Sequence, residues 1–481
     1  MFRVPPLLQN QYVAVLLLLS AFLSYGLVAI MQYSSNLQTT LLLSSLSLAT
    51  AQAGGSGVSC NLKPPHPAPV THDGWSAQLV TTDLSSPRSM IWDPKGNMIM
   101  ADWGTGITHT TFNDGGGTCL EVAKKTVLIA TDALGHGIAL SNDGKILYAS
   151  DLDKVYAWDY NADNVTVSSK NRTIITGMGN KDHVTRTLLM SQKKPGTLLV
   201  SRGSDTNIDE AAVVLDFGHA QLRAWDTNNL KPDSPSQDFA TTGQRLGWGL
   251  RNSVGVAEEP LTGGIYSVEN SADDLKRDGV DIHQTNPGEE MNYHGFLNDT
   301  SDRGNYGYPI CFGLYDTNIP NLGNLTVGAQ FSLVQNATVN DNFCARERIP
   351  PVMVFPAHNA PLDIKFQPNG SEAYVSFHGS WDRQPPDGYK IRAVPFANGF
   401  PVAPSTSLTG STTIIENVDN TKCPDDCFRP VGLLLDNKGR LWFTSDKPHP
   451  ELWVMEKNGK SSSSSTQKSG ANKRFENVAQ L

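Results

Sequence analysis

The sequence predicts an all-β protein, a six-bladed β-propeller, and three observations support this prediction. Two apolar runs of strand length, joined by a short turn that contains glycine, recur six times along the chain. The turn glycines are Gly96, Gly144, Gly196, Gly263, Gly370 and Gly439. Their spacing suits four-stranded blades that carry loops of different lengths. The runs are apolar on both faces, as expected for inner strands packed between neighbouring blades.

Each repeated unit is expected to form the inner hairpin of one blade. The paired runs are 87–92 with 98–103, 136–140 with 146–151, 183–190 with 197–202, 250–257 with 265–271, 358–366 with 373–378, and 429–435 with 440–446. The stretch from about 275 to 350 separates the fourth and fifth units and is rich in Asn and Gly. We expect it to be an insertion, because long loops in compact domains are usually functional.

The two ends of the chain are expected to lie outside the propeller, which we place at 75–459. Residues 1–53 resemble a targeting segment, with an apolar stretch from Tyr12 to Met31. That stretch has roughly the 20 residues needed to span a bilayer, and the segment exceeds the usual signal peptide of about 15–30 residues. Cleavage near Ala53 and secretion are favoured, and a retained signal anchor is the alternative. Residues 54–74 form a lead-in, and the Ser-rich tail 460–481 reads as disordered.

Composition and cysteine usage narrow the class of protein further. The formal charge of -9 argues against a nucleic-acid partner. Asn-x-Ser/Thr sequons occur at Asn164, Asn171, Asn298, Asn324, Asn336 and Asn369, which favours a secreted glycoprotein. Proximity suggests the disulfides Cys60–Cys119, Cys311–Cys344 and Cys423–Cys427. A metal site at the last pair is the alternative, but a local disulfide is favoured because no His or Cys cluster lies beside it.

The hairpin topology predicts where the functional site lies. The residue that starts the first strand and the residue that follows the second strand lie at the same end of a hairpin, so six hairpins gather these positions around one mouth of a central channel. The starting positions are Arg88, His136, His183 with Arg186, Arg251 with Asn252, His358, and Arg429. The following positions are Asp102-Trp103, Asp151, Arg202 with Asp205, Glu269-Asn270, His378 with Trp381 and Arg383, and Asp446.

Recurrence of basic and imidazole side chains at one blade position favours a functional interpretation. Taken singly, a His or Arg before a strand is more often a turn residue or a satisfied hydrogen-bond donor. Several cations that converge in a partly buried channel repel one another unless carboxylates accompany them. Those carboxylates come from the protein, from an anionic ligand, or from both.

Several segments resemble a known family, the glucose/sorbosone dehydrogenases. They are 250–255 (LRNSVG), 305–309 (NYGYP), 377–383 (FHGSWDR), 386–390 (PDGYK) and 429–431 (RPV). From about Trp75 to Glu456 the chain is more similar still to the secreted fungal pyranose dehydrogenases that depend on pyrroloquinoline quinone (PQQ). The resemblance implies a six-bladed propeller that holds PQQ and calcium over the channel. PQQ carries three carboxylates, which Arg and His side chains complement.

The resemblance also implies roles for individual residues. His183 is expected to be the general base, with His136 as second choice, and Arg251 to stabilise charge on the quinone. The expected cofactor-binding residues are Arg88, His136, Arg186, Arg202, Asn252, His358, His378, Trp381, Arg383 and Arg429. Calcium is expected near the carbonyls of Asn270 and Ser271, with Asp273 close by. Soluble bacterial members carry a glutamine where this chain has Arg88 and Trp103, so the first blade is expected to differ.

The expected activity is oxidation of a sugar, a pyranose or a sorbosone- or glucosone-like substrate, by hydride transfer to the quinone. An external acceptor, a cytochrome or a small quinone, would then take the electrons. A membrane contact is expected only if the N-terminal segment is retained. Two other classes remain open: a calcium-dependent lactonase, which requires converging acidic ligands, and a carbohydrate-binding propeller.

Overall fold

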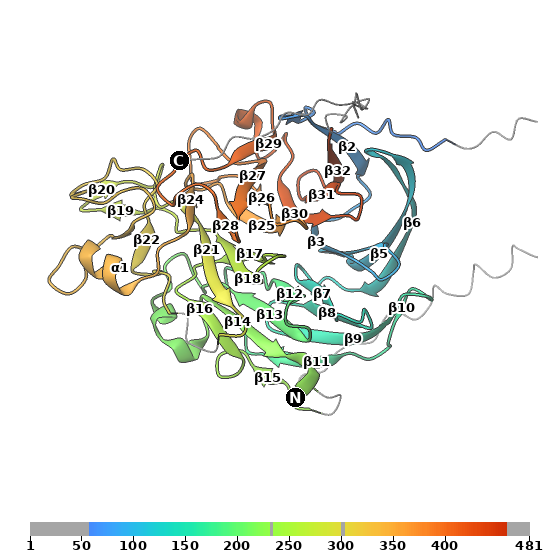
Figure 1. Cartoon of the computed structure of the whole chain (residues 1–481), viewed down its shortest axis with the longest axis horizontal. Coiled ribbons are helices and arrows are strands. Elements are labelled where there is room, and N and C mark those ends of the chain that lie inside the picture. The colour runs from blue at the N-terminus through green and yellow to red at the C-terminus, as the bar shows by residue number, and fades with distance from the viewer. Residues whose placement is uncertain (1–56, 231–233, 300–303, 459–481) are drawn as a thin grey trace, which may run out of the picture. The chain divides into compact units, whose positions relative to one another are not determined.

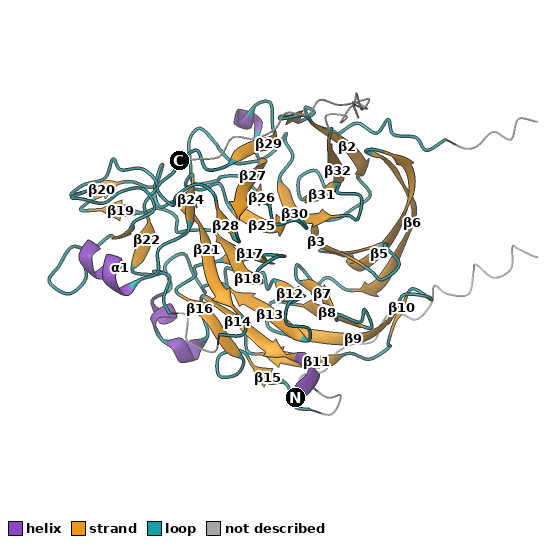
Figure 2. Cartoon of the chain, viewed as in Figure 1, coloured by secondary structure: helices purple, strands orange, loops and turns teal. Residues whose placement is uncertain are grey.

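Six β-sheets stand around a central channel, as the sequence predicts for a six-bladed propeller (Figure 1). The computed structural model describes residues 57–230, 234–299 and 304–458, all within the unit Ser56–Leu481. The expectations for residues 1–53 and 460–481 therefore lie outside the described residues. Strands dominate, and the helices are short and peripheral (Figure 2).

Each of blades 1 to 3 begins with the strand nearest the channel, and the outermost strand of blade 2 comes from a segment between two strands of blade 3. Blade 1 contains β3 (Pro87–Trp92), β4 (Met98–Asp102), β5 (Gly106–Gly116) and β6 (Cys119–Ala130). Blade 2 contains β7 (Ile138–Leu140), β8 (Ile146–Ser150), β9 (Val155–Asn161), β11 (Arg172–Thr176) and β15 (Gln237–Asp238), with β10 (Thr166–Val167) on β9. Blade 3 contains β12 (Leu188–Met190), β13 (Thr197–Arg202), β14 (Gln221–Asp226) and β16 (Gln244–Trp248).

Blades 4 to 6 complete the ring. Blade 4 contains β17 (Ser253–Glu258), β18 (Gly264–Glu269), β21 (Glu289–Phe296) and β24 (Met353–Phe355). Blade 5 contains β25 (Pro361–Phe366), β26 (Glu372–Phe377), β27 (Lys390–Ala397), β29 (Thr412–Glu416) and β1 (Val70–Thr71), with β28 (Phe400–Pro401) on β27. Blade 6 contains β30 (Pro430–Leu435), β31 (Leu441–Ser445), β32 (Glu451–Lys457) and β2 (Trp75–Thr81). Each inner strand contacts the inner strands of both neighbouring blades.

The ring is closed by strands from opposite ends of the propeller. β2 pairs antiparallel with β32, and Leu79 lies opposite Trp453 in that register. Both side chains belong to an apolar cluster that also includes Tyr374 and Ile391 of blade 5. The core therefore lies between adjacent blades, and the N-terminal strand completes the last of these interfaces.

The segment expected as an insertion is divided by a blade strand. β21 lies within 275–350 and is the third strand of blade 4, so the inserted residues lie on either side of it. The inserted parts hold β19 (Lys276–Arg277), β20 (Val280–Asp281), β22 (Cys311–Gly313), β23 (Gln330–Ser332) and α1 (Asp341–Glu347). The remaining helices are the 3-10 turns η1 (Glu210–Val213), η2 (Leu215–Phe217), η3 (Thr227–Asn229) and η4 (Asn420–Lys422). No helix among the described residues has the length and hydrophobicity of a membrane span.

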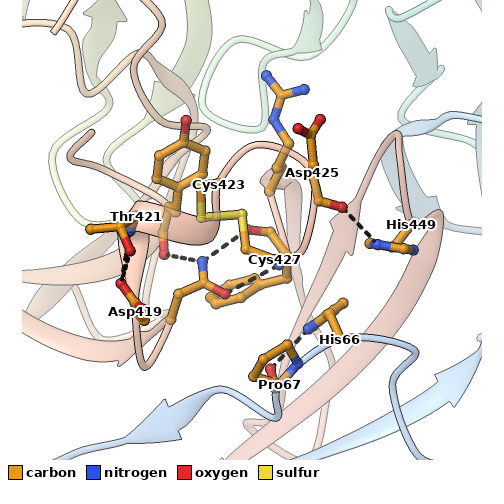
Figure 3. The surroundings of a disulfide bond; sticks show 12 residues. His66, Pro67, Asp419, Thr421, Cys423, Asp425, Cys427 and His449 are labelled. Carbon is orange, nitrogen blue, oxygen red and sulfur yellow. Dashed lines mark hydrogen bonds between the residues drawn. A yellow bond between two sulfur atoms is a disulfide. The ribbon is translucent and has the colours of Figure 1, made fainter. Parts of the chain in front are cut away.

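All three expected disulfides are present. Cys60–Cys119 joins the lead-in to β6, and Cys311–Cys344 joins β22 to α1. Cys423–Cys427 closes a loop of blade 6, which Figure 3 shows beside the hydrogen bond from His449 to the Asp425 carbonyl. The alternative of a metal site at the last pair is therefore wrong, because its two sulfur atoms are bonded to each other.

Closure of the ring by β2 makes a prediction about stability. The Leu79→Ala substitution removes a side chain that is 2% exposed, and we expect it to lower the free energy of unfolding by about 2–5 kcal/mol. Leu408→Ala, at a position that is 49% exposed, is the control, with an expected change within about 0.5 kcal/mol. Urea denaturation measures both, and equal small effects would contradict closure by this strand.

Candidate active site

A cavity of about 390 Å³ opens at the end of the channel where the inner hairpins start and finish. Its lining residues are Asp182, His183, Arg251, Asn252, Asn270, Ser271, Asp273, Glu289, His358, Ala360, Leu362, His378, Gly379, Trp381 and Arg429. The turns of the hairpins bound a second cavity, of about 430 Å³, with Pro94 and Asn142 among its lining residues. The mouth predicted from the hairpin topology is therefore the one that gathers the charged side chains.

The cavity brings most of the predicted site residues together. Predicted residues in its lining are His183, Arg251, Asn252, Asn270, Ser271, Asp273, His358, His378, Trp381 and Arg429. Arg88, His136, Arg186, Arg202 and Arg383 are not part of the lining. Lining residues that the sequence reasoning missed are Asp182, Glu289, Ala360, Leu362 and Gly379.

His183 presents an unprotonated ring nitrogen to the cavity. Its Nδ1 lies 2.9 Å from the Ser204 carbonyl oxygen and 3.0 Å from the Ser204 hydroxyl oxygen. A carbonyl oxygen only accepts, so Nδ1 carries the proton and Nε2 is left as an acceptor. Among the described residues, none donates a hydrogen bond to Nε2. Burial and the positive charge of Arg251 lower the pKa of His183 to about 4, so the ring is neutral near pH 7.

Gly203, which follows β13, allows close packing of the two segments that form this wall of the cavity. A Cβ atom at Gly203 would lie 2.7 Å from Oδ1 of Asn252 and 2.8 Å from Cβ of His183. Both distances are too short for a real carbon contact. Only glycine therefore lets the His183 loop and the start of blade 4 approach each other this closely.

Arg251 is held in a fixed orientation by protein acceptors. Its Nη2 lies 2.9 Å from Oδ2 of Asp273 and 2.8 Å from Oδ1 of Asn207. Its Nε donates to the Asn207 carbonyl at 3.1 Å, and its Nη1 donates to the Asn270 carbonyl at 3.3 Å. The guanidinium thus keeps its charge at the cavity wall, but Asp273 compensates part of that charge.

His358 lies between two carboxylates on the same side of the cavity. Its Nδ1 is 3.2 Å from Oδ1 of Asp273, and its Nε2 is 2.6 Å from the His283 carbonyl oxygen and 3.8 Å from Oδ2 of Asp382. Burial disfavours the imidazolium, but the hydrogen bond to Asp273 and the charge of Glu289 outweigh burial and raise the pKa of His358. One ligand atom each from Asp273, His358 and Asp382 lie within 4.8 Å of one another, so these three residues could hold a metal ion.

Glu289 connects two loops of the cavity and was missed by the sequence reasoning. It is the first residue of β21 and is 3% exposed. Its Oε2 accepts from the Ser271 N–H at 2.7 Å, and its Oε1 accepts from the Ala360 N–H at 3.0 Å. One carboxylate therefore joins the loop after β18 to the loop before β25. The signal in the sequence was a pair of acidic residues, Glu289 and Glu290, before a short stretch that mixes apolar and polar residues.

Four blades contribute to a second charged cluster at this mouth of the channel. Asp446 accepts from Nη1 of Arg88 through Oδ2 and from Nε2 of His378 through Oδ1, both at 2.8 Å. Nη2 of Arg429 lies 3.1 Å from Nδ1 of His378. Nε of Arg88 donates to Nδ1 of His136 at 3.3 Å. Because His136 lines the second cavity, Arg88 and His136 lie in the channel between the two cavities.

Three predicted cofactor residues bind the protein's own atoms outside the cavity lining. Arg186 donates from Nη1 to the His183 carbonyl at 2.7 Å, and Arg202 donates from Nη1 to the Phe217 carbonyl at 2.7 Å. Nη1 of Arg383 lies 3.3 Å from the Ala357 carbonyl oxygen. These guanidinium groups are therefore held by loop carbonyls, and the expectation that the three arginines bind the cofactor stays a prediction.

The fold and the cavity together define a class: a six-bladed propeller with a pocket lined by arginine and histidine side chains at one mouth of its channel. The chain belongs to the TrAA12-like family, whose model matches residues 69–458. A pyrroloquinoline quinone-dependent sugar dehydrogenase of Hypocrea jecorina (strain QM6a) is 49% identical over 402 residues, 82% of this chain and 91% of the relative. A pyrroloquinoline quinone-dependent pyranose dehydrogenase of Coprinopsis cinerea is 33% identical over 401 residues, 80% of this chain but 54% of that longer relative.

Solved structures give the same relationship. The calcium structure of the Trichoderma reesei family AA12 enzyme superposes with a TM-score of 0.81 at 50% identity, covering 83% of this chain and 99% of that one. The holo form of the Coprinopsis cinerea pyranose dehydrogenase PQQ domain gives a TM-score of 0.77 at 32% identity, covering 82% of this chain and 98% of that one. The predicted family and fold are therefore confirmed.

The environment of His183 predicts how stability depends on pH. The pKa of His183 is about 4 in the folded protein, against an ordinary value of 6.5, so between these values the unfolded chain binds a proton that the folded protein does not. Stability is therefore lost as the pH falls through this range, by about 3 kcal/mol for this one group. We expect the free energy of unfolding of His183→Gln to fall less steeply from pH 6.5 to pH 4 than that of the wild type. Parallel curves from urea denaturation would contradict the environment described for His183.

Proposed function

We propose that this protein is a quinoprotein sugar dehydrogenase that uses PQQ and calcium and oxidises a CH–OH group of a sugar. The observation that carries the proposal is found in one cavity, where, among the described residues, a neutral histidine has a free Nε2 and an arginine has no carboxylate partner. The names of the relatives support PQQ as the cofactor and a sugar as the substrate. The neutral histidine is His183, and the arginine is Arg429.

The residues of the cavity fit a tricarboxylate. Arg429 makes no ion pair with any described carboxylate, and its Nε is buried without a hydrogen-bond partner. The residue is half-buried, and an anionic ligand would give this guanidinium a charge partner and Nε an acceptor. The amide of Asn252 and the ring of Trp381, which is 72% exposed, lie in the same lining and would complete the binding site. We therefore propose that Arg429, Asn252 and Trp381 hold PQQ directly, and that His378, whose two ring nitrogens face Asp446 and Arg429, holds it through Arg429.

A calcium ion fits the side of the cavity that carries the carboxylates. Calcium takes oxygen ligands from carboxylates and carbonyls, and Asp273 and Asp382 supply carboxylates there. We propose that the carbonyls of Asn270 and Ser271 complete the ligand set together with Asp273. The calcium structure of the Trichoderma reesei enzyme gives this proposal a precedent in the family.

The chain's own residues perform the proton chemistry. The quinone, when bound, supplies a hydride acceptor. Nε2 of His183 takes the hydroxyl proton of the substrate, and the Ser204 carbonyl keeps Nδ1 protonated so that the ring stays oriented. The carboxylates of a bound polyanion would raise the pKa of His183 above the value of about 4, which makes it a better base. Arg251, fixed by Asp273 and Asn207, directs positive charge at the reacting end.

The location, substrate class and electron acceptor of the enzyme are also proposals, and they rest on the sequence. We propose secretion, a pyranose or a sorbosone- or glucosone-like substrate, and electron transfer to an external acceptor, a cytochrome or a small quinone. The asparagines of all six sequons are exposed, which suits a glycoprotein: Asn164, Asn171, Asn298, Asn324, Asn336 and Asn369.

The arrangement of acids does not favour a lactonase. Such an enzyme needs carboxylates that converge on the channel, but Oδ1 of Asp102 caps the backbone N–H groups of Ser85 and Ser86. Asp151 likewise accepts from the backbone of its own turn. In the cavity lining, Asp273 is paired with Arg251 and His358, and Glu289 accepts from two backbone N–H groups.

Substitution of His183 tests the proposed function. The purified protein, loaded with PQQ and calcium, is expected to show quinone absorbance that bleaches when an oxidisable sugar is added. We expect His183→Ala to bind PQQ but to lose turnover by about 100-fold or more, since general-base catalysis contributes about 10²–10⁴-fold.

His72→Ala is the matched control, because His72 pairs with Glu416 on blade 5 and is not part of the cavity lining. It should keep wild-type turnover. Full activity of His183→Ala would rule out the assigned base, and absence of any spectral change in the wild type across a panel of aldoses, ketoses and 2-keto sugars would rule out the proposed function.

A further inference from the structure

We propose that Asp446 is a positioning residue that fixes the tautomer of His378, and that His378 in turn orients the guanidinium of Arg429 at the cavity wall. Asp446 follows β31 and is not part of the cavity lining. The consequence for cofactor binding rests on the proposed function, because there Arg429 holds the anionic cofactor. The assignment of the tautomer rests on the geometry alone.

The hydrogen-bond partners of His378 define which ring nitrogen carries the proton. Nε2 lies 2.8 Å from Oδ1 of Asp446, and an ionised carboxylate only accepts hydrogen bonds. Nδ1 lies 3.1 Å from Nη2 of Arg429, and a guanidinium only donates. His378 is therefore the neutral tautomer with a proton on Nε2 and a lone pair on Nδ1.

The charge states agree with this assignment. Burial raises the pKa of Asp446, but the hydrogen bond from His378 and the charges of Arg88 and Arg429 outweigh burial and leave it well below its ordinary value. Burial is also the main cause that lowers the pKa of His378, and the neighbouring arginines add to it. A carboxylate beside a neutral imidazole is thus the state expected near pH 7.

Arg429 depends on His378 for its direction. The backbone of Arg429 is fixed by its N–H bond to Oγ of Ser445 at 2.9 Å, two residues after the Cys423–Cys427 disulfide. The guanidinium has two hydrogen bonds among the described residues, one to Nδ1 of His378 and one to the Lys447 carbonyl at 3.2 Å. If Nδ1 carried a proton, it would oppose the Nη2 donor, and Arg429 would lose the contact that directs it into the cavity.

The Asp446→Asn substitution is expected to reverse the tautomer. Arg88 only donates, so the single amide oxygen of the new side chain is drawn to Nη1 of Arg88, which Asp446 binds at 2.8 Å. The amide N–H group then faces Nε2 of His378. His378 must accept at Nε2 and carry its proton on Nδ1, where it conflicts with Arg429. The same logic explains how an asparagine in place of a catalytic-triad aspartate selects the wrong histidine tautomer.

Nitrogen NMR of the histidine rings tests the tautomer directly, with or without a bound cofactor. Among the 11 histidines, His378 is assigned from the signal that disappears in His378→Gln. In uniformly [15N]histidine-labelled protein near pH 7, the wild type should show a protonated Nε2 and an unprotonated Nδ1. Asp446→Asn should show the reverse. A wild-type His378 that is an imidazolium or carries its proton on Nδ1, or an unchanged spectrum in Asp446→Asn, would overturn the proposal.

Asp102→Asn is the matched control. Asp102 is also buried and ends the second strand of its blade's hairpin, but its Oδ1 accepts from backbone N–H groups. This variant should lose stability without changing the His378 signals. A change of the His378 tautomer in Asp102→Asn would also overturn the proposal, because the tautomer would then follow general loosening of the fold.

Cofactor affinity tests the effect on Arg429. We expect Asp446→Asn to raise the Kd for PQQ by about tenfold or more, the loss of one hydrogen bond to a charged group, and Asp102→Asn to leave it unchanged. In an Arg429→Met background, Asp446→Asn should have no further effect on the Kd. An undiminished effect in that background would show that Asp446 does not act through Arg429.

A second variant, which keeps the Asp446–Arg88 pair, tests the proposal if Asp446→Asn does not fold. His378→Phe removes the acceptor for Arg429 and should raise the Kd for PQQ to a similar extent, and an unchanged Kd would overturn the proposal. If the wild type binds no PQQ at all, the proposed function fails, while the nitrogen spectra of the cofactor-free protein still decide the tautomer.

Discussion

Compensation of positive charge at the channel mouth is the constraint on which the rest of the site depends. Two aspartates provide it in the same way. Asp446 accepts from an arginine at the start of one blade and from a histidine of another, namely Arg88 and His378. Asp273 contacts a second such pair, Arg251 and His358. Each carboxylate therefore binds separate blades together at the axis and allows cations to stand in a buried channel.

The two groups left over from this pairing are the ones that a reaction needs. Arg429 has a buried Nε without a partner, and Nε2 of His183 has no donor among the described residues. In the proposed function, the first group would attract an anion and the second would take a proton. Because both belong to the lining of one cavity, an anionic oxidant and a substrate hydroxyl can be held in the same space. Arg88 and Arg251 are thus paired with aspartates of the protein, whereas Arg429 is the arginine that we propose for the cofactor.

The sequence predicted the fold and the location of the site because both follow from local rules. Glycine turns between apolar runs define hairpins, and hairpin geometry decides which strand ends meet. It did not predict where long side chains point. Arg186 and Arg202 occupy the right blade positions, but their flexible stems turn toward backbone carbonyls behind the cavity. Glu289 was missed because the strand it starts, β21, lies inside the stretch interpreted as an insertion.

The sequence also did not predict which side chains from distant parts of the chain form ion pairs. Asp446 and Arg88 are 358 residues apart, and nothing local to either residue indicates the other. The disulfides were predictable because their cysteines are close along the chain, with separations of 59, 33 and 4 residues. Ring closure brings the first and last blades together, and only the closed ring shows which acid compensates which cation.

The most direct test of the account is a calorimetric titration of PQQ into Arg429→Gln, with Arg88→Gln beside it. If Arg88 is already compensated by Asp446 and Arg429 is the cation left for the cofactor, Arg429→Gln should raise the Kd by about tenfold or more, well beyond the effect of Arg88→Gln. Equal affinities for Arg429→Gln and the wild type would contradict the central claim that charge compensation leaves this arginine to bind the anion.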